Sequence, residues 1–162
     1  MLTVLIPTRN SEEALARTLA SLVSGAVEGM IREVMVCDDG SLDGTEKVAD
    51  HAGCVFLAGA GLPQGLARAR GEWLLVLEPG SRLMAGWTDA VRDHMAGDDR
   101  PARFRRGGAR RDRWLDWISA EGPLRAGLLL RHRQMAAVLD PQGALSLPRG
   151  VCRLPAEIIP AP

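Results

Sequence analysis

Four short apolar runs alternate with amphipathic segments over the first 98 residues. Each run is bounded by polar or turn residues, as expected of a buried strand, and the segments between the runs place apolar residues at helical spacing. This alternation predicts an α/β fold, with a mostly parallel central sheet, right-handed crossovers and helices on both faces. The predicted elements are strands at 2–6, 33–37, 54–58 and 73–77, and helices from 10 or 11 to about 24, from 43 to 53 and at 66–70.

The helix ends are predicted from capping residues. Asn10, with Glu13 three residues later, is typical of a capping pair, and Gly25 is the expected stop of the first helix. Asp43, followed by Glu46, is expected to cap the second helix in the same way.

The pattern is less regular after the fourth strand. In chain order it predicts a helix at 87–95, a basic stretch interrupted by glycine at 100–114, a helix start at 114–119, a strand at 127–130 and a helix at 132–139. The tail, at 151–160, is expected to form an edge strand, because its prolines exclude it from the interior of a sheet.

The composition is that of an ordinary globular domain. The 162 residues are 46% apolar and 25% charged, which is consistent with a single domain. No apolar run approaches the roughly 18 residues of a membrane span, and the N-terminus has no leader pattern, so secretion is not expected. The three cysteines, Cys37, Cys54 and Cys152, lie in apolar contexts and favour reduced thiols in a cytoplasmic protein.

The charge is divided unevenly between the two parts of the chain. Residues 1–99 carry 8 basic and 15 acidic side chains, a net charge of −7, whereas residues 100–162 carry 12 and 5, a net charge of +7. Two surfaces with different partners are therefore expected. Nucleic acid is not an expected partner, because no aromatic-interleaved motif accompanies the basic residues.

Polar turns follow the predicted strands at one edge of the sheet. Parallel strands end at the same edge, so the turns at 7–10, 38–41, 59–65 and 78–81 are expected to meet there. The first turn lacks the glycine fingerprint of dinucleotide-binding dehydrogenases. The second places Asp38 and Asp39 at the edge, where a carboxylate can accept hydrogen bonds from base N–H groups or sugar hydroxyls.

Three motifs in this order, IPTRNSEE, EVMVCDDGSLDGT and ARGEWLLVL, resemble those of the family 2 glycosyltransferases. The resemblance covers about residues 2–95, and the weaker GLLLRHRQM resembles the segment after the acceptor loop of a family subgroup. It implies a Rossmann-like GT-A fold in one domain, with a nucleotide-sugar-binding half at 1–98 and a short, basic acceptor-side half at 99–162.

The resemblance also implies which residues bind the donor nucleotide. Thr8 would lie near the base or ribose, Asp39 would contact the base, with uracil expected, and Asp38 would support the loop. Arg68 is a candidate for facing the phosphates. The complete implied set is Pro7, Thr8, Asn10, Asp38, Asp39, Gly40, Ser41 and Arg68.

The metal motif departs from the family pattern. Glu78 and Gly80 take the positions of the two aspartates that hold Mg²⁺ or Mn²⁺ against the diphosphate in the family. Glu78 is therefore the one candidate metal ligand in this turn. The candidates for the general base, which removes the proton from the hydroxyl group of the acceptor, are Asp116 and Glu121.

The basic segment 100–117 has three interpretations. It is a solvated loop, or a lid in which arginines replace the metal against phosphates, with Gly107 and Gly108 as the hinge. Alternatively, Trp114 and Trp117 beside the arginines favour a peripheral contact with the cytoplasmic face of a membrane.

Two functions remain open on the sequence. The first is transfer of a sugar from a nucleotide-diphosphate donor, with UDP-sugar expected, to an unknown acceptor. The second is a catalytically inactive nucleotide-binding or partner-binding module, indicated by the altered metal motif. An oligomer is compatible with the small size of the domain.

Overall fold

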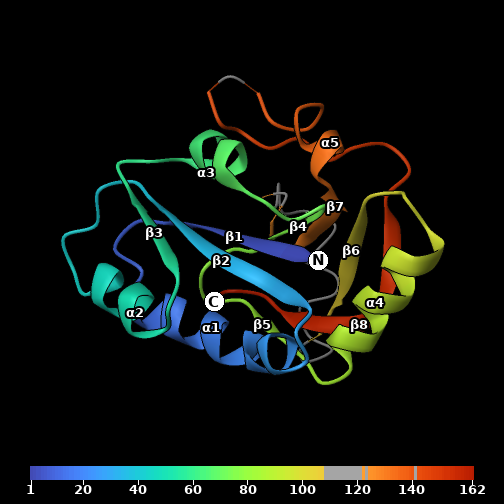
Figure 1. The fold of residues 1–162 in the computed structure, drawn as a ribbon, viewed down its shortest axis with the longest axis horizontal. Coiled ribbons are helices and arrows are strands. Elements are labelled where there is room, and N and C mark those ends of the chain that lie inside the picture. The colour runs from blue at the N-terminus through green and yellow to red at the C-terminus, as the bar shows by residue number, and fades with distance from the viewer. Residues whose placement is uncertain (108–121, 123, 141) are drawn as a thin grey trace.

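The computed structural model describes residues 1–107, 122, 124–140 and 142–162 (Figure 1). The strands are β1 (Leu2–Thr8), β2 (Ile31–Asp38), β3 (Val55–Ala58), β4 (Trp73–Val76), β5 (Arg82–Leu83), β6 (Ala102–Arg106), β7 (Leu128–Arg131) and β8 (Cys152–Ile159). The helices are α1 (Glu12–Val27), α2 (Thr45–His51), α3 (Leu62–Arg68), α4 (Trp87–Gly97) and α5 (His132–Met135).

The eight strands of the described residues form one sheet in the order β3-β2-β1-β4-β7-β6-β8-β5. Strands β1 to β4 are parallel, as predicted, and β7 pairs antiparallel with both β4 and β6. Strand β8 runs parallel to β6, and the short β5 lies antiparallel to β8 at the edge. Because β7 joins β4, strands from both halves of the chain share one sheet.

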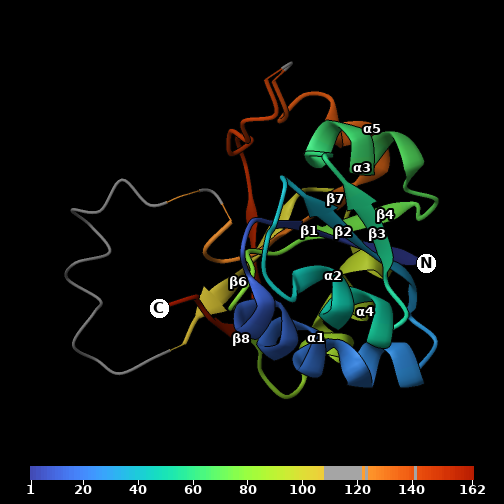
Figure 2. The same cartoon turned by 90° about the vertical axis from the view of Figure 1, so that its left-hand side faces the viewer.

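Helices cover both faces of this sheet, which confirms the predicted α/β architecture. Helices α1, α2 and α4 lie on one side of the sheet, and α3 and α5 lie on the other (Figures 1 and 2). Side chains alternate between the two faces along each strand. Strand β1 therefore contributes Val4 and Ile6 to the core under α1 and α4, and Leu5 to the core under α3 and α5. None of the helices in the described ranges combines the length and the apolar character that crossing a bilayer requires.

The first helix starts at one of its two predicted positions, but its predicted capping pair and stop are wrong. Ser11 is the N-cap of α1, and Asn10 has a φ of 47°, outside the helix. Gly25 does not stop the helix, which continues to Val27. Instead, Gly25 makes room for a tryptophan, because a Cβ there would lie 2.5 Å from Cη2 of Trp87.

The loop predicted at 59–65 is partly helical. Helix α3 begins at Leu62 and ends at Arg68, two residues before the predicted end. Pro63 lies in its first turn, where the missing N–H group of proline costs no intrahelical hydrogen bond. A proline in the first turn is therefore a helix-start signal, although the glycines around it indicated a loop.

The second half differs most from the prediction. The basic stretch contains a strand, β6, in which Ala102 and Phe104 are buried, and α5 spans only four residues. The tail strand β8 is not an edge strand, because β6 and β5 flank it. Its Pro155 lies where the register shifts between Arg103 and Arg105 of β6, so the ladder tolerates the missing donor. The helix start predicted at 114–119 lies outside the described residues.

Candidate functional site

The ends of β1 and β2 are joined through a buried carboxylate. Thr8 and Asp38 are register partners, and the Thr8 hydroxyl donates to Asp38 Oδ1 at 2.8 Å. Ser41 donates its backbone N–H to Asp38 Oδ2 at 2.8 Å and its hydroxyl to Oδ1 at 2.5 Å. Burial alone would raise the pKa of Asp38, but the hydrogen bonds from Ser41 and Thr8 outweigh it and hold the pKa below its ordinary value. Asp38 is therefore a charged structural residue.

A second pair of hydrogen bonds joins the same two turns. The backbone N–H of Asn10 donates to Ser41 Oγ at 2.8 Å, and the N–H of Leu42 donates to Asn10 Oδ1 at 2.8 Å. The left-handed conformation of Asn10 and the φ of 75° at Gly40 let both turns bend at this point. Asn10 thus shapes the turn, instead of capping α1 as predicted.

The starts of α1 and α2 are interlocked just behind these turns. Asp43 Oδ2 accepts the N–H of Glu12 at 3.1 Å, and Glu12 Oε2 accepts the N–H of Gly44 at 3.0 Å. Asp43 Oδ1 also accepts from the hydroxyl and N–H of Thr45, and the hydroxyl contact lowers the pKa of Asp43. Asp43 therefore serves the starts of two helices, although Gly44, and not Asp43, is the N-cap residue of α2.

Asp39, the neighbour of the buried aspartate, faces solvent. Its side chain is 76% exposed and pairs at 3.4 Å with Arg9, which is 71% exposed. An exposed pair of this length contributes little to stability. The Asp39 carboxylate can exchange Arg9 for a ligand donor, whereas the carboxylate of Asp38 is occupied by three internal donors.

The turn after β4 holds the one candidate metal ligand of the motif. Glu78 Oε2 is buried and has no hydrogen-bond partner within the described residues. Ser81 donates its hydroxyl to the Glu78 carbonyl at 2.6 Å, and the N–H of Gly80 donates to Thr18 Oγ1 at 2.9 Å. The turn is therefore hydrogen-bonded to α1, and Glu78 Oε2 does not take part in these hydrogen bonds.

Gly80 could not carry the second carboxylate of the metal motif without strain. Its φ is 97°, and a Cβ there would lie 3.0 Å from Cβ of Ala161. Across the described ranges, no three His, Cys, Asp or Glu side chains gather closely enough to hold a metal ion. Coordination of Mg²⁺ by Oε2, with phosphates and water as the other ligands, would require this buried oxygen to become accessible.

Arg68 is not part of the two joined turns. It is exposed at the end of α3, the end that leads to the start of β4. Arg70 is likewise exposed, and its backbone N–H donates to Glu33 Oε1 at 2.7 Å. Both arginines therefore follow the chain toward the edge of the sheet opposite the turns.

The start of the motif ARGEWLLVL, which contains Ala69, Gly71 and Glu72, has a packing role at that opposite edge. Ala69 is buried, and a Cβ at Gly71 would lie 2.6 Å from the backbone nitrogen of Thr3 and 2.9 Å from the carbonyl oxygen of Trp73. Only glycine allows this approach of the chain to β1. Glu72 forms an ion pair with Arg131.

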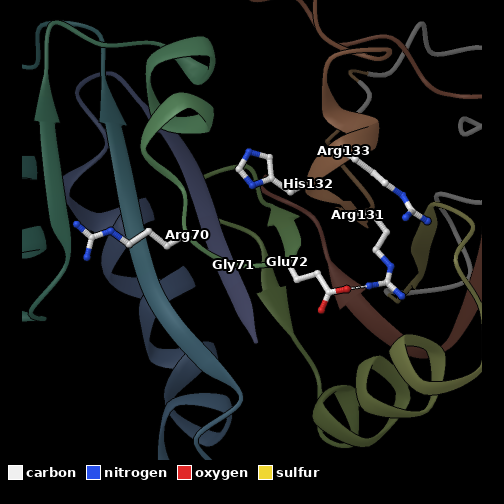
Figure 3. Close-up of a pocket in the computed structure, with 6 residues that line it drawn as sticks. All are labelled: Arg70, Gly71, Glu72, Arg131, His132 and Arg133. Atoms are coloured by element: carbon white, nitrogen blue, oxygen red, sulfur yellow. Dashed lines mark hydrogen bonds and ion pairs between the residues drawn. The ribbon is translucent and has the colours of Figure 1, made fainter.

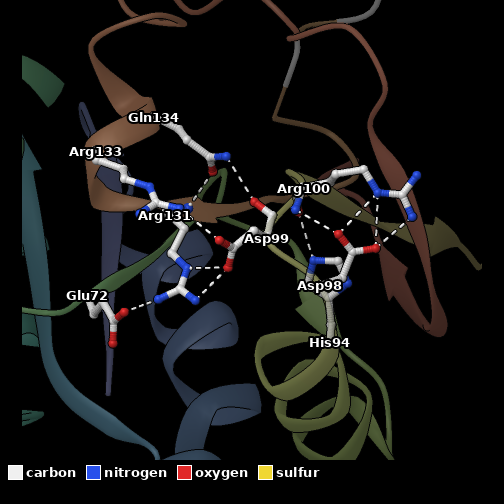
Figure 4. Close-up of polar contacts among 8 residues, drawn as sticks. All are labelled: Glu72, His94, Asp98, Asp99, Arg100, Arg131, Arg133 and Gln134. Atoms are coloured by element: carbon white, nitrogen blue, oxygen red, sulfur yellow. Dashed lines mark hydrogen bonds and ion pairs between the residues drawn. The ribbon is translucent and has the colours of Figure 1, made fainter.

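Arg131 is the centre of a charged network that the sequence did not predict. Its guanidinium group lies 4.5 Å above the Trp73 ring. The same group pairs with Glu72 and, at 2.6 Å, with Asp99 (Figure 4). Asp99 also accepts from Arg133 at 2.7 Å. The partners are about 30 to 60 residues apart in sequence, so no local pattern could have revealed them.

A pocket of about 370 Å³ opens beside this network. Figure 3 shows the guanidinium group of Arg70 directed away from Arg131 and Arg133, so the cations do not converge on one point. The residues lining it are Arg70, Gly71, Glu72, Arg131, His132 and Arg133. The charged groups of the network are paired with one another, and these pairs stabilise the edge of the sheet at the start of β4.

The candidate bases Asp116 and Glu121 lie outside the described residues, as do Gly108, Trp114 and Trp117. In segment 100–117, for which three interpretations were given, the described part contains the strand Ala102–Arg106. The candidate site therefore comprises Thr8, Asn10 and Asp38–Ser41 at the ends of β1 and β2, with Glu78 at the end of β4.

A four-stranded parallel unit in the order β3-β2-β1-β4, continued by the antiparallel β7 and covered by helices on both faces, defines a GT-A type glycosyltransferase fold. The match to the Glycosyl transferase family 2 model spans residues 3–114. The chain belongs to this family.

Solved structures support the fold assignment. Glucosyl-3-phosphoglycerate synthase from Mycobacterium tuberculosis, in complex with Mn²⁺, UDP and glucosyl-3-phosphoglycerate, matches with a TM-score of 0.60 and 18% identity over 86% of this chain and 59% of that chain. Mannosyl-3-phosphoglycerate synthase from Rubrobacter xylanophilus gives 0.61 and 16% over 85% and 56%. S. aureus TarS in complex with UDP gives 0.63 and 18% over 84% and 48%.

A TPR repeat-containing protein of Synechococcus elongatus is 35% identical over 89 residues, which are 50% of this chain and 21% of that protein. The chain thus spans about a fifth of this relative and about half to three fifths of the three solved chains.

Proposed function

We propose that the protein transfers a sugar from a nucleotide-diphosphate donor, with a UDP-sugar expected, to a hydroxyl group of an acceptor. The observation that carries this proposal is that the two adjacent aspartates of this family 2 member differ in burial and in hydrogen bonding. Asp38 is 3% exposed and joins two turns, while the side chain of Asp39 is 76% exposed beside it. UDP is bound by two of the similar solved proteins, which supports the choice of nucleotide.

In this proposal, Asp39 accepts a hydrogen bond from an N–H group of the base after leaving Arg9. Thr8, Asn10 and Ser41 hold the surrounding turns in place through the hydrogen bonds described above, and Pro7 and Gly40 belong to the same two turns. The hydrogen bonds of Asp38 keep these turns fixed before the donor arrives, so binding need not order them.

The transfer step requires groups on the acceptor side of the donor. The acceptor oxygen forms a bond to the anomeric carbon, and the bond from that carbon to the diphosphate breaks, with its electron pair leaving on the diphosphate. The hydroxyl proton passes to a base, for which Asp116 and Glu121 are the proposed candidates. We assign the donor side to residues 1–98 and the acceptor side to residues 99–162.

Glu78 would hold Mg²⁺ or Mn²⁺ through its unsatisfied oxygen. The cation would neutralise negative charge on the departing diphosphate. Glu78 lies just past the end of β4, and its buried Oε2 would have to become accessible when the donor and the cation bind. Location in the cytoplasm, with or without contact to a membrane surface, stays a prediction.

The direct test is thermal unfolding with UDP, GDP and TDP and their sugars, each with and without Mn²⁺. A ligand that binds the folded state at about 100 times its Kd stabilises it by about 2.7 kcal/mol. We expect UDP and UDP-sugars to raise the unfolding temperature and Asp39→Ala to abolish the increase. Asp93→Ala, an exposed aspartate on α4, is the matched control and should keep it.

Glu78→Gln separates the metal from the nucleotide. This variant should retain the shift with UDP alone and lose the additional shift that Mn²⁺ provides. Absence of any nucleotide shift at millimolar concentration would refute the donor proposal. Binding without hydrolysis or transfer of any donor would instead favour the inactive nucleotide-binding module.

A further inference from the structure

Residues 160–162, which follow β8, cross the turn at the end of β4. Arg82 pairs with Ile159 between β5 and β8, and the chain then runs past Gly80. A Cβ at Gly80 would lie 3.0 Å from Cβ and 3.5 Å from Cα of Ala161. In Figure 1, the C label lies beside the loop that leads to β5. This segment, the strap, therefore fills the space into which a side chain at position 80 would point.

The strap lies at the end of the candidate site that the diphosphate and the cation would occupy. Glu78 and Gly80 stand at the two positions of the family's metal motif. Ser81 is 1% exposed, and Glu78 Oε2 is buried without a hydrogen-bond partner within the described residues. By contrast, the side chain of Asp39 is 76% exposed. The nucleoside end of the site is thus open, whereas the diphosphate end is closed.

The turn beneath the strap is fixed to α1. The N–H group of Gly80 donates to the carbonyl oxygen of Ala14 at 3.0 Å and to Thr18 Oγ1 at 2.9 Å. The Ser81 hydroxyl donates to the Glu78 carbonyl oxygen at 2.6 Å. Because this turn cannot move without disturbing α1, an opening of the diphosphate end has to come from the strap.

The strap itself is held by contacts that are easily broken. Pro160 and Pro162 have no N–H group, so the pairing of β8 cannot continue through them. Within the described ranges, no backbone hydrogen bond joins the strap to its neighbours. Arg125 Nη2 donates to the Ala161 carbonyl oxygen at 3.0 Å. A segment with so few backbone hydrogen bonds opens at a low cost in free energy.

We infer that residues 160–162 close the diphosphate end of the donor site and are displaced when the donor binds. The inference rests on the proposed function and adds to it the step by which the Glu78 turn becomes accessible. On displacement, Ala161 leaves Gly80 and its carbonyl oxygen gives up the hydrogen bond from Arg125. The pairing of β5 with β8, which precedes the strap, is retained.

The buried oxygen of Glu78 favours this displacement. A buried carboxylate oxygen without a hydrogen bond raises the free energy of the folded state. Once the strap has left the turn, water or a cation held by the diphosphate reaches Glu78 Oε2. Part of the cost of opening is therefore recovered when the donor and the cation bind.

Reaction of a cysteine in the strap with N-ethylmaleimide measures the opening. Ala161→Cys should react at least roughly threefold faster with UDP and Mn²⁺ than without them, because the rate follows the population of the open state. Leu147→Cys, at an exposed position before β8, is the matched control and should react equally fast in both conditions. The wild-type chain gives the background from Cys37, Cys54 and Cys152. An unchanged or slower reaction of Ala161→Cys would overturn the inference.

A reversible cross-link tests whether the donor needs the opening. The Cβ atoms of Ala14 and Ala161 lie 3.6 and 3.0 Å from one point, the Cβ position that Gly80 lacks. Oxidation of Ala14→Cys/Ala161→Cys should tie the strap to α1 through a disulfide, verified by mass spectrometry. The increase in unfolding temperature with UDP and Mn²⁺ should be lost on oxidation and return on reduction. Ala14→Cys alone, treated with the same oxidant, should keep the increase.

Uridine shows which end of the site the cross-link closes. It carries the base and the ribose without the diphosphate, so it should stabilise the oxidised and reduced forms equally. In the oxidised form, the effect of UDP with Mn²⁺ should fall to that of uridine. Equal effects of UDP with Mn²⁺ on both forms would overturn the inference. Loss of the uridine effect on oxidation would overturn the assignment of the strap to the diphosphate end.

Failure of the proposed function has a different signature. In that case UDP does not stabilise the wild-type chain, with or without Mn²⁺, and the role of the strap falls with the donor site. If UDP stabilises the wild-type chain and the cross-linked chain alike, the proposed function stands and the inference about the strap alone is wrong.

Discussion

The hydroxyl of Thr8 donates a 2.8 Å hydrogen bond to Asp38 Oδ1 and so joins the ends of two neighbouring parallel strands. Both side chains are buried, with 4% and 3% of their surface exposed. This contact makes Asp38 part of the scaffold and leaves the next residue, Asp39, as the carboxylate presented to solvent. Two identical residues in one motif therefore have different roles.

Thr8→Val tests the contact with a side chain of similar shape. Loss of one hydrogen bond to a buried carboxylate should lower the free energy of unfolding by about 1–3 kcal/mol and weaken UDP binding, because the β1 and β2 turns lose a connection. Thr88→Val is the control, since its hydroxyl bonds to Glu28 on the α1–α4 side. It should reduce stability without affecting UDP. Equal UDP affinity in all three proteins would contradict the role of Thr8.

The pH dependence of stability should report the buried aspartate. The pKa of Asp38 is lower in the folded chain than in the unfolded chain, so protons bind preferentially to the unfolded state as the pH falls. The stabilisation is complete above about pH 4, the unfolded value, and is lost as the pH falls through the folded pKa. The free energy of unfolding, measured with urea at pH values from about 2.5 to about 7 in steps of roughly one pH unit, should show this loss. In Asp38→Asn this free energy should depend less steeply on pH. Asp43 and Asp98, whose pKa values are also lowered, will maintain the remaining slope.

Gly71→Ala should be strongly destabilising. The added Cβ would lie 2.6 Å from the backbone nitrogen of Thr3, which can move only with β1. Overpacking of this kind typically costs about 1–3 kcal/mol. Gly97→Ala, at the end of α4 with no atom within 4 Å of the new Cβ, is the matched control. It should be neutral or stabilising by less than about 1 kcal/mol. Similar denaturation midpoints for both variants would show that β1 yields at Gly71.

Arg131→Gln should separate stability from donor binding. Arg131 is 18% exposed, pairs with Glu72 and Asp99, and stacks on Trp73, so its removal should cost about 1–3 kcal/mol. Arg92→Gln also removes two ion pairs, but the Arg92 side chain is 50% exposed, and the expected cost is below about 1 kcal/mol. UDP affinity should remain at the wild-type value in both variants. A weaker affinity in Arg131→Gln alone would place the charged network within the donor site.

The first four strands and the order of the helices between them followed from the sequence, because each apolar run is short, continuous and bounded by turn residues. Some of the helix ends did not follow. Asn10 had the residue type of a helix cap, but its side chain bonds to Leu42, 32 residues away. Gly25 had the type of a helix stop, but it adapts α1 to Trp87. In both cases a tertiary contact outweighed the local preference.

The basic half was the least predictable part, since the strand in Ala102–Arg106 depends on pairing with β7 and β8. By itself, the sequence determined a parallel α/β sheet, the positions of its polar turns and the aspartate pair after β2, because these depend on residue type and local spacing. Only the tertiary structure decided that Asp38 is buried, that Asp39 is exposed and that Arg103 lies beside Arg153. Those outcomes depend on register and packing between segments distant in the chain, which no local pattern encodes.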